Sequence, residues 1–274
     1  MEIEAAGARP ARDDEKTGDS TRCVHAGEDR THAGLGGRIE RSASFRLDDA
    51  AVAALRAGRP RDTWLYGRYG NPSVATTEAR LAALEGADGC LLAASGMGAM
   101  RAALGSLLHP GARVVAARAL YGGNLELLRK GFAPWGVHVD LVDFSDLAAV
   151  ERALAAEAAV DAARVLVCES ISNPLLRVTD LPRLSELAGR YRAHLVVDAT
   201  FATPLVQRPL ELGADLVVHS ATKMLSGHGD VIGGAVLGRR ELLDAVWREL
   251  VRDGATPDPE AAFLIERGVS TLAL

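Results

Sequence analysis

The stretch His219-Ser-Ala-Thr-Lys-Met-Leu-Ser-Gly-His-Gly-Asp230 follows the apolar run Leu216-Val-Val218 and places one lysine, Lys223, among hydroxyl side chains. A lysine at the carboxyl end of a buried strand can lose its proton and act as an amine nucleophile toward an aldehyde. Ser220 and Thr222 offer hydroxyl donors that suit a phosphate, and the glycines after the lysine permit a tight turn. The segment suggests a phosphorylated aldehyde cofactor, pyridoxal phosphate. Taken alone, it also fits a surface lysine in a small polar turn.

A carboxylate, Asp198, closes the apolar part of Leu195-Val-Val-Asp-Ala-Thr200. Open α/β sheets gather ligand-binding groups at this end of their strands. A pyridoxal ring needs an acid beside its ring nitrogen, because the protonated ring accepts electrons from a substrate carbanion. Asp198 is the candidate for that acid, and its alternative role is that of a helix cap or turn residue.

A third apolar run, Arg164-Val-Leu-Val-Cys168, also ends in polar residues. Three successive runs that stop at Glu169, Asp198 and Ser220 predict parallel strands that deliver side chains to one edge of a sheet. Helices are expected between the strands at residues 124–132, 145–157 and 181–192, the last capped by Thr179 or Asp180. This alternation predicts β-α-β crossovers and an α/β fold with a mostly parallel sheet flanked by helices.

Upstream, Leu91-Leu-Ala-Ala-Ser-Gly-Met-Gly98 has the pattern of a strand, a glycine turn and the start of a helix. Backbone N–H groups at that helix start could hold an anion through the positive end of the helix dipole. The rival interpretation is a dinucleotide fingerprint, but Arg101 stands where G-x-G-x-x-G needs its third small residue. The pattern favours a phosphate turn and disfavours a dinucleotide-dependent oxidoreductase.

Two aromatic clusters complete the candidate site. Tyr121 precedes Gly122-Gly123 and could place a flat ring against a cofactor ring, or be a partly buried turn tyrosine. Tyr66 and Arg68 lie two residues apart in a glycine-rich loop. Arginine binds phosphate bidentately, although a solvated loop arginine is the alternative interpretation.

Several motifs, in this order and spacing, resemble the Cys/Met-metabolism pyridoxal-phosphate enzymes, which include cystathionine synthases and lyases, methionine γ-lyases and O-acylhomoserine sulfhydrylases. The motifs are Tyr66-Gly-Arg68 with Asn71-Pro72, Ser95-Gly-Met97, Tyr121-Gly-Gly123, Glu169-Ser-Ile-Ser-Asn-Pro174, Val197-Asp-Ala-Thr200 and His219 to Asp230. The likeness covers nearly everything from Thr21 onward. It implies a fold-type I large domain at residues 63–260, an N-terminal arm at 21–62 and the start of a C-terminal region at 261–274.

The resemblance implies a role for each matching position. Lys223 would carry the cofactor as an imine and then move the substrate Cα proton, and Asp198 would pair with the pyridine nitrogen. Tyr121 would stack on the ring and assist leaving-group chemistry. The residues implied to contact the cofactor's phosphate are Gly96, Met97, Ser220 and Thr222. Asn173 would lie near the cofactor's phenolic oxygen or the substrate carboxylate.

The resemblance also implies a shared site. Tyr66 and Arg68 would reach the phosphate of the cofactor in a neighbouring subunit, so a homo-oligomer, either a dimer or a tetramer, is implied. The family continues into a small C-terminal domain that supplies an arginine for the substrate carboxylate. This chain ends at Leu274, so we expect a truncated product. The sequence leaves open whether Arg38, Arg46 or another residue takes the place of that arginine.

The activity implied is β- or γ-elimination or γ-replacement on sulfur-containing or O-acylated amino acids, of the cystathionine γ-synthase or γ-lyase type. Gly123 stands where methionine γ-lyases carry a cysteine, which argues against that activity. The alternative from another class is a truncated cofactor-binding pseudoenzyme or partner subunit without turnover of its own.

Composition agrees with a cytoplasmic enzyme. The 274 residues are 48% hydrophobic, enough for one substantial α/β core, and the net charge of -5 leaves no electrostatic footprint for nucleic acid. Residues 1–20 lack an apolar stretch, which predicts a disordered tail and neither a signal peptide nor a membrane span. The 3 cysteines are widely spaced, which favours buried thiols in a reducing compartment. The scattered histidines predict no metal site.

Overall fold

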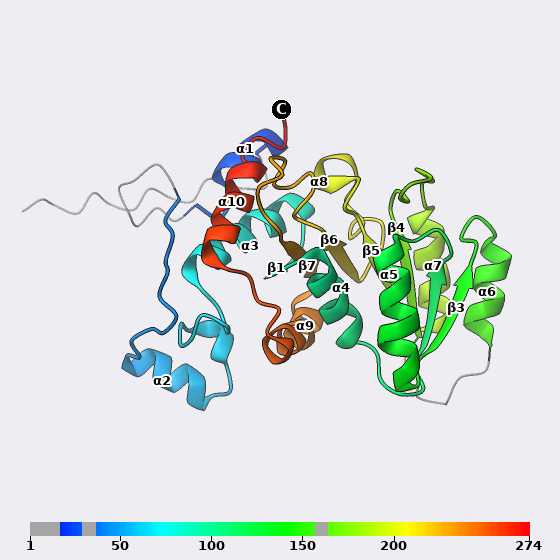
Figure 1. The fold of residues 1–274 in the computed structure, drawn as a ribbon, viewed down its shortest axis with the longest axis horizontal. Coiled ribbons are helices and arrows are strands. Elements are labelled where there is room, and N and C mark those ends of the chain that lie inside the picture. The colour runs from blue at the N-terminus through cyan, green and yellow to red at the C-terminus, as the bar shows by residue number, and fades with distance from the viewer. Residues whose placement is uncertain (1–16, 29–36, 157–163) are drawn as a thin grey trace, which may run out of the picture.

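A seven-stranded sheet forms the centre of the molecule, in the order β1-β7-β6-β5-β4-β2-β3 (Figure 1). The structure is a computed structural model that describes residues 17–28, 37–156 and 164–274. Its strands are β1 (Gly89–Ala93), β2 (Arg113–Ala117), β3 (His138–Val142), β4 (Arg164–Glu169), β5 (Ala193–Asp198), β6 (Leu216–His219) and β7 (Gly234–Gly238). β7 runs antiparallel to β1 and β6, and the other pairs of described strands are parallel. The predicted mostly parallel sheet is confirmed.

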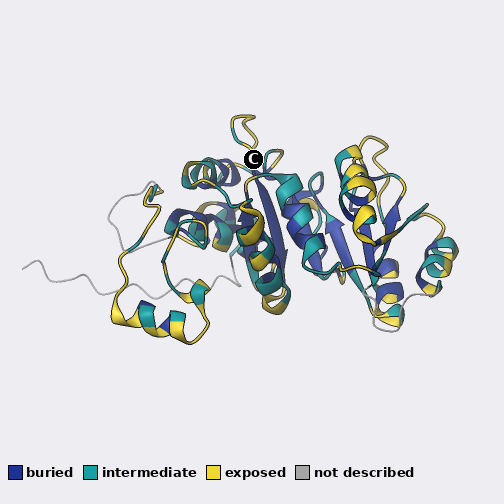
Figure 2. Ribbon diagram, turned by 60° about the horizontal axis from the view of Figure 1, so that its bottom comes forward, coloured by how far each residue is buried: buried dark blue, intermediate teal, exposed yellow. Residues whose placement is uncertain are grey.

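The central strands are buried because helices cover both faces of the sheet. Figure 2 shows the sheet as a dark blue layer, with the exposed residues of the flanking helices on their outer sides. Near-continuous apolar runs such as Leu195-Val-Val197 are typical of strands buried on both faces. Glu169 and Asp198 are register partners, and Asp198 in turn pairs with Val218. The three predicted strand ends therefore meet at one edge of the sheet.

The helices alternate with the strands along the chain. They are α1 (Asp19–His25), α2 (Asp49–Arg56), α3 (Pro72–Glu85), α4 (Gly96–Gly105), α5 (Gly122–Glu126), α6 (Leu147–Ala155), α7 (Leu181–Tyr191), α8 (Thr203–Val206), α9 (Arg240–Asp253) and α10 (Pro259–Val269). Short irregular turns occur at η2 (Pro60–Asp62), η3 (Leu127–Phe132) and η4 (Ala133–Trp135). Side-chain caps satisfy free backbone N–H groups at several of these helix starts, those of α2, α3, α4, α6, α7 and α10.

The three predicted helices exist with adjusted ends. The first begins at Gly122 and passes into a π-helical turn at Leu127, where the prediction had one helix over 124–132. The second begins at Leu147 because Asp146 is its cap, and the last predicted residue, Glu157, lies outside the described residues. The third is capped by Asp180, whose carboxylate accepts a hydrogen bond from the backbone of Arg183, as one of the two expected caps.

The described N-terminal region lies on one side of the body (Figure 1). Residues 1–16 of the predicted tail lie outside the described residues, while Asp19 and Ser20, also assigned to the tail, belong to α1. α2 stands away from the sheet at the lower left of Figure 1. The arm returns to the body where Arg61 pairs with Asp244 of α9. No helix in the described part of the chain is long and apolar enough to cross a membrane.

Candidate active site

A cavity of about 310 Å³ opens where β4, β5 and β6 end. It contains eight of the ten residues predicted for the site, namely Gly96, Met97, Tyr121, Asn173, Asp198, Ser220, Thr222 and Lys223. Ser95, Asn124, Glu169, Ile171, Thr200, Phe201 and Ile232 complete the lining. The topology produces this gathering, because the carboxyl ends of parallel strands share one edge of a sheet.

Lys223 lies in the lysine loop, which we define as residues 220–233 between β6 and β7. Its backbone N–H donates to the Ser220 carbonyl at 3.1 Å, and its own carbonyl accepts from Gly227 N–H at 2.9 Å. Gly227 has φ +68, a left-handed conformation that glycine adopts without strain. Among the described residues, no side chain forms a hydrogen bond or ion pair with the Lys223 amine. The amine is therefore exposed in the cavity and available for chemistry.

The Asp198 carboxylate is held by three donors. Its Oδ1 accepts hydrogen bonds from the backbone N–H of Thr200 at 3.1 Å and from the Thr200 hydroxyl at 2.6 Å. Its Oδ2 accepts from Asn124 Nδ2 at 3.2 Å. The Thr200 hydroxyl also accepts from Ser220 N–H at 2.8 Å, which ties the end of β5 to the start of the lysine loop.

The start of α4 forms a tight cradle beside that loop. Ser95 caps the helix, its Oγ accepting from Gly98 N–H at 3.0 Å. A Cβ at Gly96 would lie 2.8 Å from the Ser220 Cβ, so only glycine lets the two backbones approach this closely. The Thr222 hydroxyl bonds to the backbone of Gly233, donating to its carbonyl at 3.1 Å and accepting from its N–H at 3.0 Å.

A buried carboxylate, Glu169, lines the cavity and accepts hydrogen bonds from two backbone N–H groups of neighbouring lining residues. Its Oε1 accepts from Tyr121 N–H at 2.5 Å and its Oε2 accepts from Asn173 N–H at 2.8 Å. Burial raises the pKa of the Glu169 carboxyl, while these two backbone hydrogen bonds lower it. Glu169 thus fixes the backbones from which the Tyr121 ring and the Asn173 amide project.

Two predicted residues, Tyr66 and Arg68, are not among those that line this cavity. Arg68 Nη1 donates to the carbonyl of Val251 at 2.8 Å, and its guanidinium lies 5.6 Å and 5.0 Å from the ring centroids of Tyr66 and Tyr69. Arg38 and Arg46, the candidates for the substrate carboxylate, are also absent from the lining.

Sequence reasoning left the supporting residues unassigned. Asn124 and Thr200 both bond to Asp198, and Glu169 was predicted only as a strand end and as part of a family motif, without a role of its own. Thr200 follows Asp198 by two residues, which is the spacing of an Asx turn and the one signal that could have found it. Asn124 had no comparable signal, because it lies 74 residues from its partner.

These groups fit pyridoxal phosphate. The cavity combines an unpaired primary amine for an aldehyde, a hydrogen-bonded carboxylate for a ring nitrogen, and a glycine cradle that a Cβ would fill. Among the described residues, no group of three or more His, Cys, Asp or Glu side chains could hold a metal ion.

Comparisons with known proteins give matches over most of the chain. The family model described as Cys/Met metabolism PLP-dependent enzyme matches residues 20–274. L-methionine gamma-lyase of Pseudomonas putida is 40% identical over 94% of this chain and 64% of its own length. O-succinylhomoserine sulfhydrylase of Pseudomonas aeruginosa is 40% identical over 93% of this chain and 62% of its own length.

Among solved structures, cystathionine gamma synthase from Xanthomonas oryzae pv. oryzae, in complex with aminoacrylate and cysteine, has a TM-score of 0.83 and 35% identity. The match covers 94% of this chain and 64% of that one, so this chain spans just under two thirds of the length of such relatives. The likeness confirms the expected fold-type I architecture. The chain belongs to the Cys/Met metabolism PLP-dependent enzyme family.

Proposed function

We propose that this chain catalyses β- or γ-elimination or γ-replacement on sulfur-containing or O-acylated amino acids, in the manner of a cystathionine γ-synthase or γ-lyase. One observation carries the proposal: the free amine of Lys223 and the hydrogen-bonded carboxylate of Asp198 line the same cavity. The relatives support the reaction class, since they are named as a γ-lyase, a sulfhydrylase and a γ-synthase.

The chain's own residues supply attachment, orientation and proton transfer. Pyridoxal phosphate supplies the electron sink when it is bound. Lys223 is proposed to attach the cofactor and then to move the proton at the substrate Cα. Asp198, oriented by Thr200 and Asn124, is proposed to keep the ring nitrogen protonated.

The remaining contacts are proposed from position. The Gly96 and Met97 amides, with Ser220 and Thr222, would hold the phosphate at the start of α4, where the helix dipole favours an anion. Thr222 would have to redirect the proton that it now donates to Gly233. Tyr121 would stack on the cofactor ring, and Asn173 would approach its phenolic oxygen or the substrate carboxylate.

We also propose that the functional unit is a homo-oligomer in which Tyr66 and Arg68 reach the cofactor of a neighbouring subunit. Both residues are exposed, and Tyr66 shows 42% of its surface to solvent, which supports an intersubunit role. Residues 63–260 are proposed as the cofactor-binding domain, with 21–62 as its arm and 261–274 as the start of a C-terminal region. A cytoplasmic location is supported by the free, buried state of Cys23, Cys90 and Cys168.

The test is covalent capture followed by product analysis. Purified protein is mixed with pyridoxal phosphate, reduced with borohydride and digested, and the adduct is sought on the peptide that contains Lys223. The Lys223→Ala variant is the matched control and should show no adduct there. Unreduced protein is then incubated with cystathionine, O-succinylhomoserine, homocysteine and cysteine, while keto acid, ammonia and thioether are measured.

The outcomes of this test distinguish an active enzyme, a cofactor-binding protein without turnover, and a wrong cofactor assignment. An adduct at Lys223 with product from any of these substrates supports the proposal. An adduct without product supports the alternative of a cofactor-binding pseudoenzyme or partner subunit. No adduct in the wild-type protein overturns the cofactor assignment, and with it the reaction class.

A further inference from the structure

We propose that helix α10 is a positioning element for Lys223: Gly268 holds the lysine loop in place through Ser226, and the buried Arg80–Glu266 ion pair holds α10. The inference rests on the proposed function of Lys223. It assigns a role to residues outside the cavity lining, on α10, the second helix after the last strand β7, which contacts the lysine loop.

Helix α10 meets the lysine loop through a backbone-to-backbone contact between Gly268 and Ser226. Gly268 lies in the second half of α10, and an ideal Cβ built on it would lie 2.1 Å from the Ser226 carbonyl oxygen and 2.5 Å from the Ser226 Cα. Real Cβ atoms do not approach backbone atoms so closely, so a side chain at position 268 would have to push the two segments apart. Because main-chain atoms meet here, neither side can relieve the clash by rotating a side chain.

Hydrogen bonds connect Ser226 to the backbone around Lys223. Ser226 is fully buried and lies three residues after Lys223. Its hydroxyl lies 3.1 Å from the carbonyl oxygen of Thr222 and 3.3 Å from that of Lys223, and it donates toward both. Its backbone N–H donates to the carbonyl of Ala221 at 3.0 Å. A displacement of Ser226 would therefore displace the backbone that carries the Lys223 amine.

Helix α10 also contacts the far end of the lysine loop. A Cβ at Gly233 would lie 2.6 Å from the Cδ1 of Ile265, a fully buried residue of α10. Arg267 of α10 forms an ion pair with Asp230 in the same loop. One helix thus contacts the lysine loop at Ser226, Asp230 and Gly233, so its position sets the shape of the whole segment.

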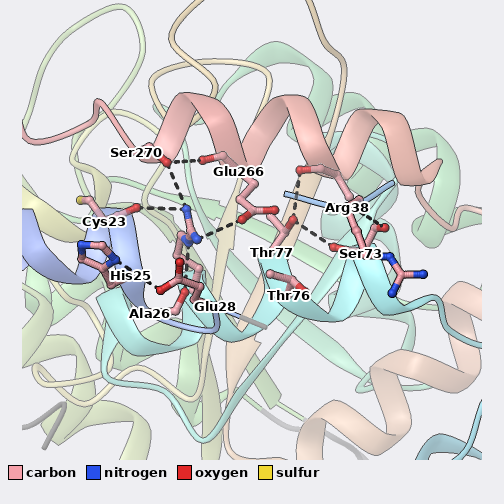
Figure 3. Close-up of polar contacts among 12 residues, drawn as sticks. Cys23, His25, Ala26, Glu28, Arg38, Ser73, Thr76, Thr77, Glu266 and Ser270 are labelled. Atoms are coloured by element: carbon pink, nitrogen blue, oxygen red, sulfur yellow. Dashed lines mark hydrogen bonds and ion pairs between the residues drawn. The ribbon is translucent and has the colours of Figure 1, made fainter. Parts of the chain in front are cut away.

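Polar contacts with α3 attach α10 to the body of the protein. Figure 3 shows Glu266 on α10 and Ser270 at the C-terminal cap of that helix directed toward α3, with Thr77 on the facing helix. Arg80 of α3 pairs with Glu266 at 2.9 Å, with the two side chains only 5% and 12% exposed, and it donates to the Ser270 hydroxyl at 3.0 Å. The Thr77 hydroxyl donates to the carbonyl of Ala262 at 3.0 Å.

The same arginine also fastens α1. Arg80 Nε donates to the Ala26 carbonyl at 3.0 Å and Nη1 donates to the Cys23 carbonyl at 3.3 Å. A guanidinium suits this task because its planar fork presents several donors in fixed directions. Arg80 therefore joins α1, α3 and α10. Because α10 contacts the lysine loop, we expect the position of the loop to depend on these contacts of Arg80.

The principal test substitutes Gly268→Ala in the full chain. Gly189→Ala is the matched control, because Gly189 also lies in a helix, α7, and has no atom within 4 Å of the added Cβ. Hydrogen exchange is measured on peptides from residues 220–233 without cofactor, well below each variant's melting temperature. Apparent affinity for pyridoxal phosphate and the borohydride-trapped fraction at Lys223 are measured on the same samples.

We expect faster exchange in the lysine loop of Gly268→Ala and cofactor affinity lowered by at least about tenfold, because small displacements of a reacting group carry large penalties. Gly189→Ala should match the wild type in both. A Gly268→Ala protein that melts earlier but keeps wild-type loop exchange and cofactor affinity would show that α10 is only structural, and would overturn the inference.

Two further variants keep the inference testable if Gly268→Ala does not fold. Ser226→Ala retains the backbone contact but removes the hydroxyl, and should accelerate loop exchange and weaken cofactor binding. Glu266→Gln removes the charge that pairs with Arg80, and should accelerate exchange in both α10 and the loop. Wild-type exchange in the loop for both variants would overturn the inference.

Absence of an adduct at Lys223 in the wild-type protein would instead refute the proposed function. The exchange data would still show whether α10 and the lysine loop are coupled.

Discussion

The Thr200 hydroxyl donates its one hydrogen to the Asp198 carboxylate at 2.6 Å, which leaves its oxygen oriented to accept from Ser220 N–H at 2.8 Å. The acid at the end of β5 and the first residue of the lysine loop are therefore joined through a single side-chain oxygen. The relative position of Asp198 and the lysine depends on this link.

Thr200→Val tests the link because valine keeps the shape and loses the hydroxyl. The variant leaves Ser220 N–H and one lone pair of Asp198 without partners, so we expect a loss of about 2–3 kcal/mol in the free energy of unfolding, with weaker cofactor binding. Urea unfolding and cofactor titration measure the two effects. Thr200→Ser retains the hydroxyl and should stay close to the wild type; equal losses in both variants would contradict the role of the hydrogen bonds.

Gly96→Ala tests the cradle at the start of α4. The added Cβ would lie 2.8 Å from the Ser220 Cβ, so α4 and the lysine loop must separate and the phosphate amides must move. We expect affinity for pyridoxal phosphate to fall by at least about tenfold, equivalent to about 1.4 kcal/mol. Equilibrium titration measures it. The control is Gly105→Ala in the same helix. Its added Cβ would have its nearest neighbour at an ordinary 3.5 Å, so this variant should bind the cofactor as the wild type does.

Gly123→Cys tests the space beside Tyr121. A Cβ at this position would lie 2.5 Å from Cε1 of Tyr121 and 3.0 Å from the Met97 sulfur, so the aromatic ring must turn away from its present place. If that ring stacks on the cofactor, kcat/KM for the best wild-type substrate should fall by about 10²-fold. Gly122→Ala, whose Cβ would meet nothing within 4 Å, is the control. A Gly123→Cys enzyme with unchanged kcat/KM would show that the ring position is not critical.

Glu78→Gln tests a titration outside the active-site cavity. Burial raises the pKa of Glu78 from 4.5 to about 7, although the Leu92 N–H that bonds to it and the nearby Arg61 oppose the rise. Between these two values the folded protein keeps the proton while the unfolded chain releases it, so stability falls as the pH rises. The component lost is on the order of 3 kcal/mol.

Glutamine retains an acceptor for Leu92 N–H, 2.7 Å from the carboxylate in the wild type, and cannot ionise. The difference in the free energy of unfolding between Glu78→Gln and the wild type should therefore shift in favour of the variant as the pH is raised from 4.5 through 7. Urea unfolding at several pH values measures the difference, and curves that stay parallel over this range would contradict the assignment.

The predictable part of the fold was the sheet edge that carries the site. β4, β5 and β6 are short apolar runs closed by polar residues, a pattern that identifies buried parallel strands without knowledge of their neighbours. β3 and β7 had no such signal. His138 begins β3 exposed and the rest of that strand is only partly buried, while β7 is a five-residue segment with glycine at both ends.

The site residues also fall into those that the sequence could predict and those that it could not. Lys223, Asp198 and Gly96 could be found because their chemistry requires a particular residue type at a strand end or helix start. The groups that orient them could not, since Asn124 and Asp198 are brought together only by the packing of α5 against the sheet edge. The contact between Gly268 and Ser226 was hidden for the same reason, because a glycine in a helix carries no sign of what lies against it.

The antiparallel strand β7 contributes no side chain to the cavity lining, yet it pairs with both of the strands that lead into the lysine loop and the start of α4. It is inserted between β1, which leads into Gly96, and β6, which leads into Lys223, so these strands are separated by two interstrand spacings, roughly 10 Å. A fragment that ended before Gly234 would retain both residues and lose the spacer between them. Such a fragment would contain residues from both sides of the cofactor pocket but would lack the strand that holds β1 and β6 in their places in the sheet.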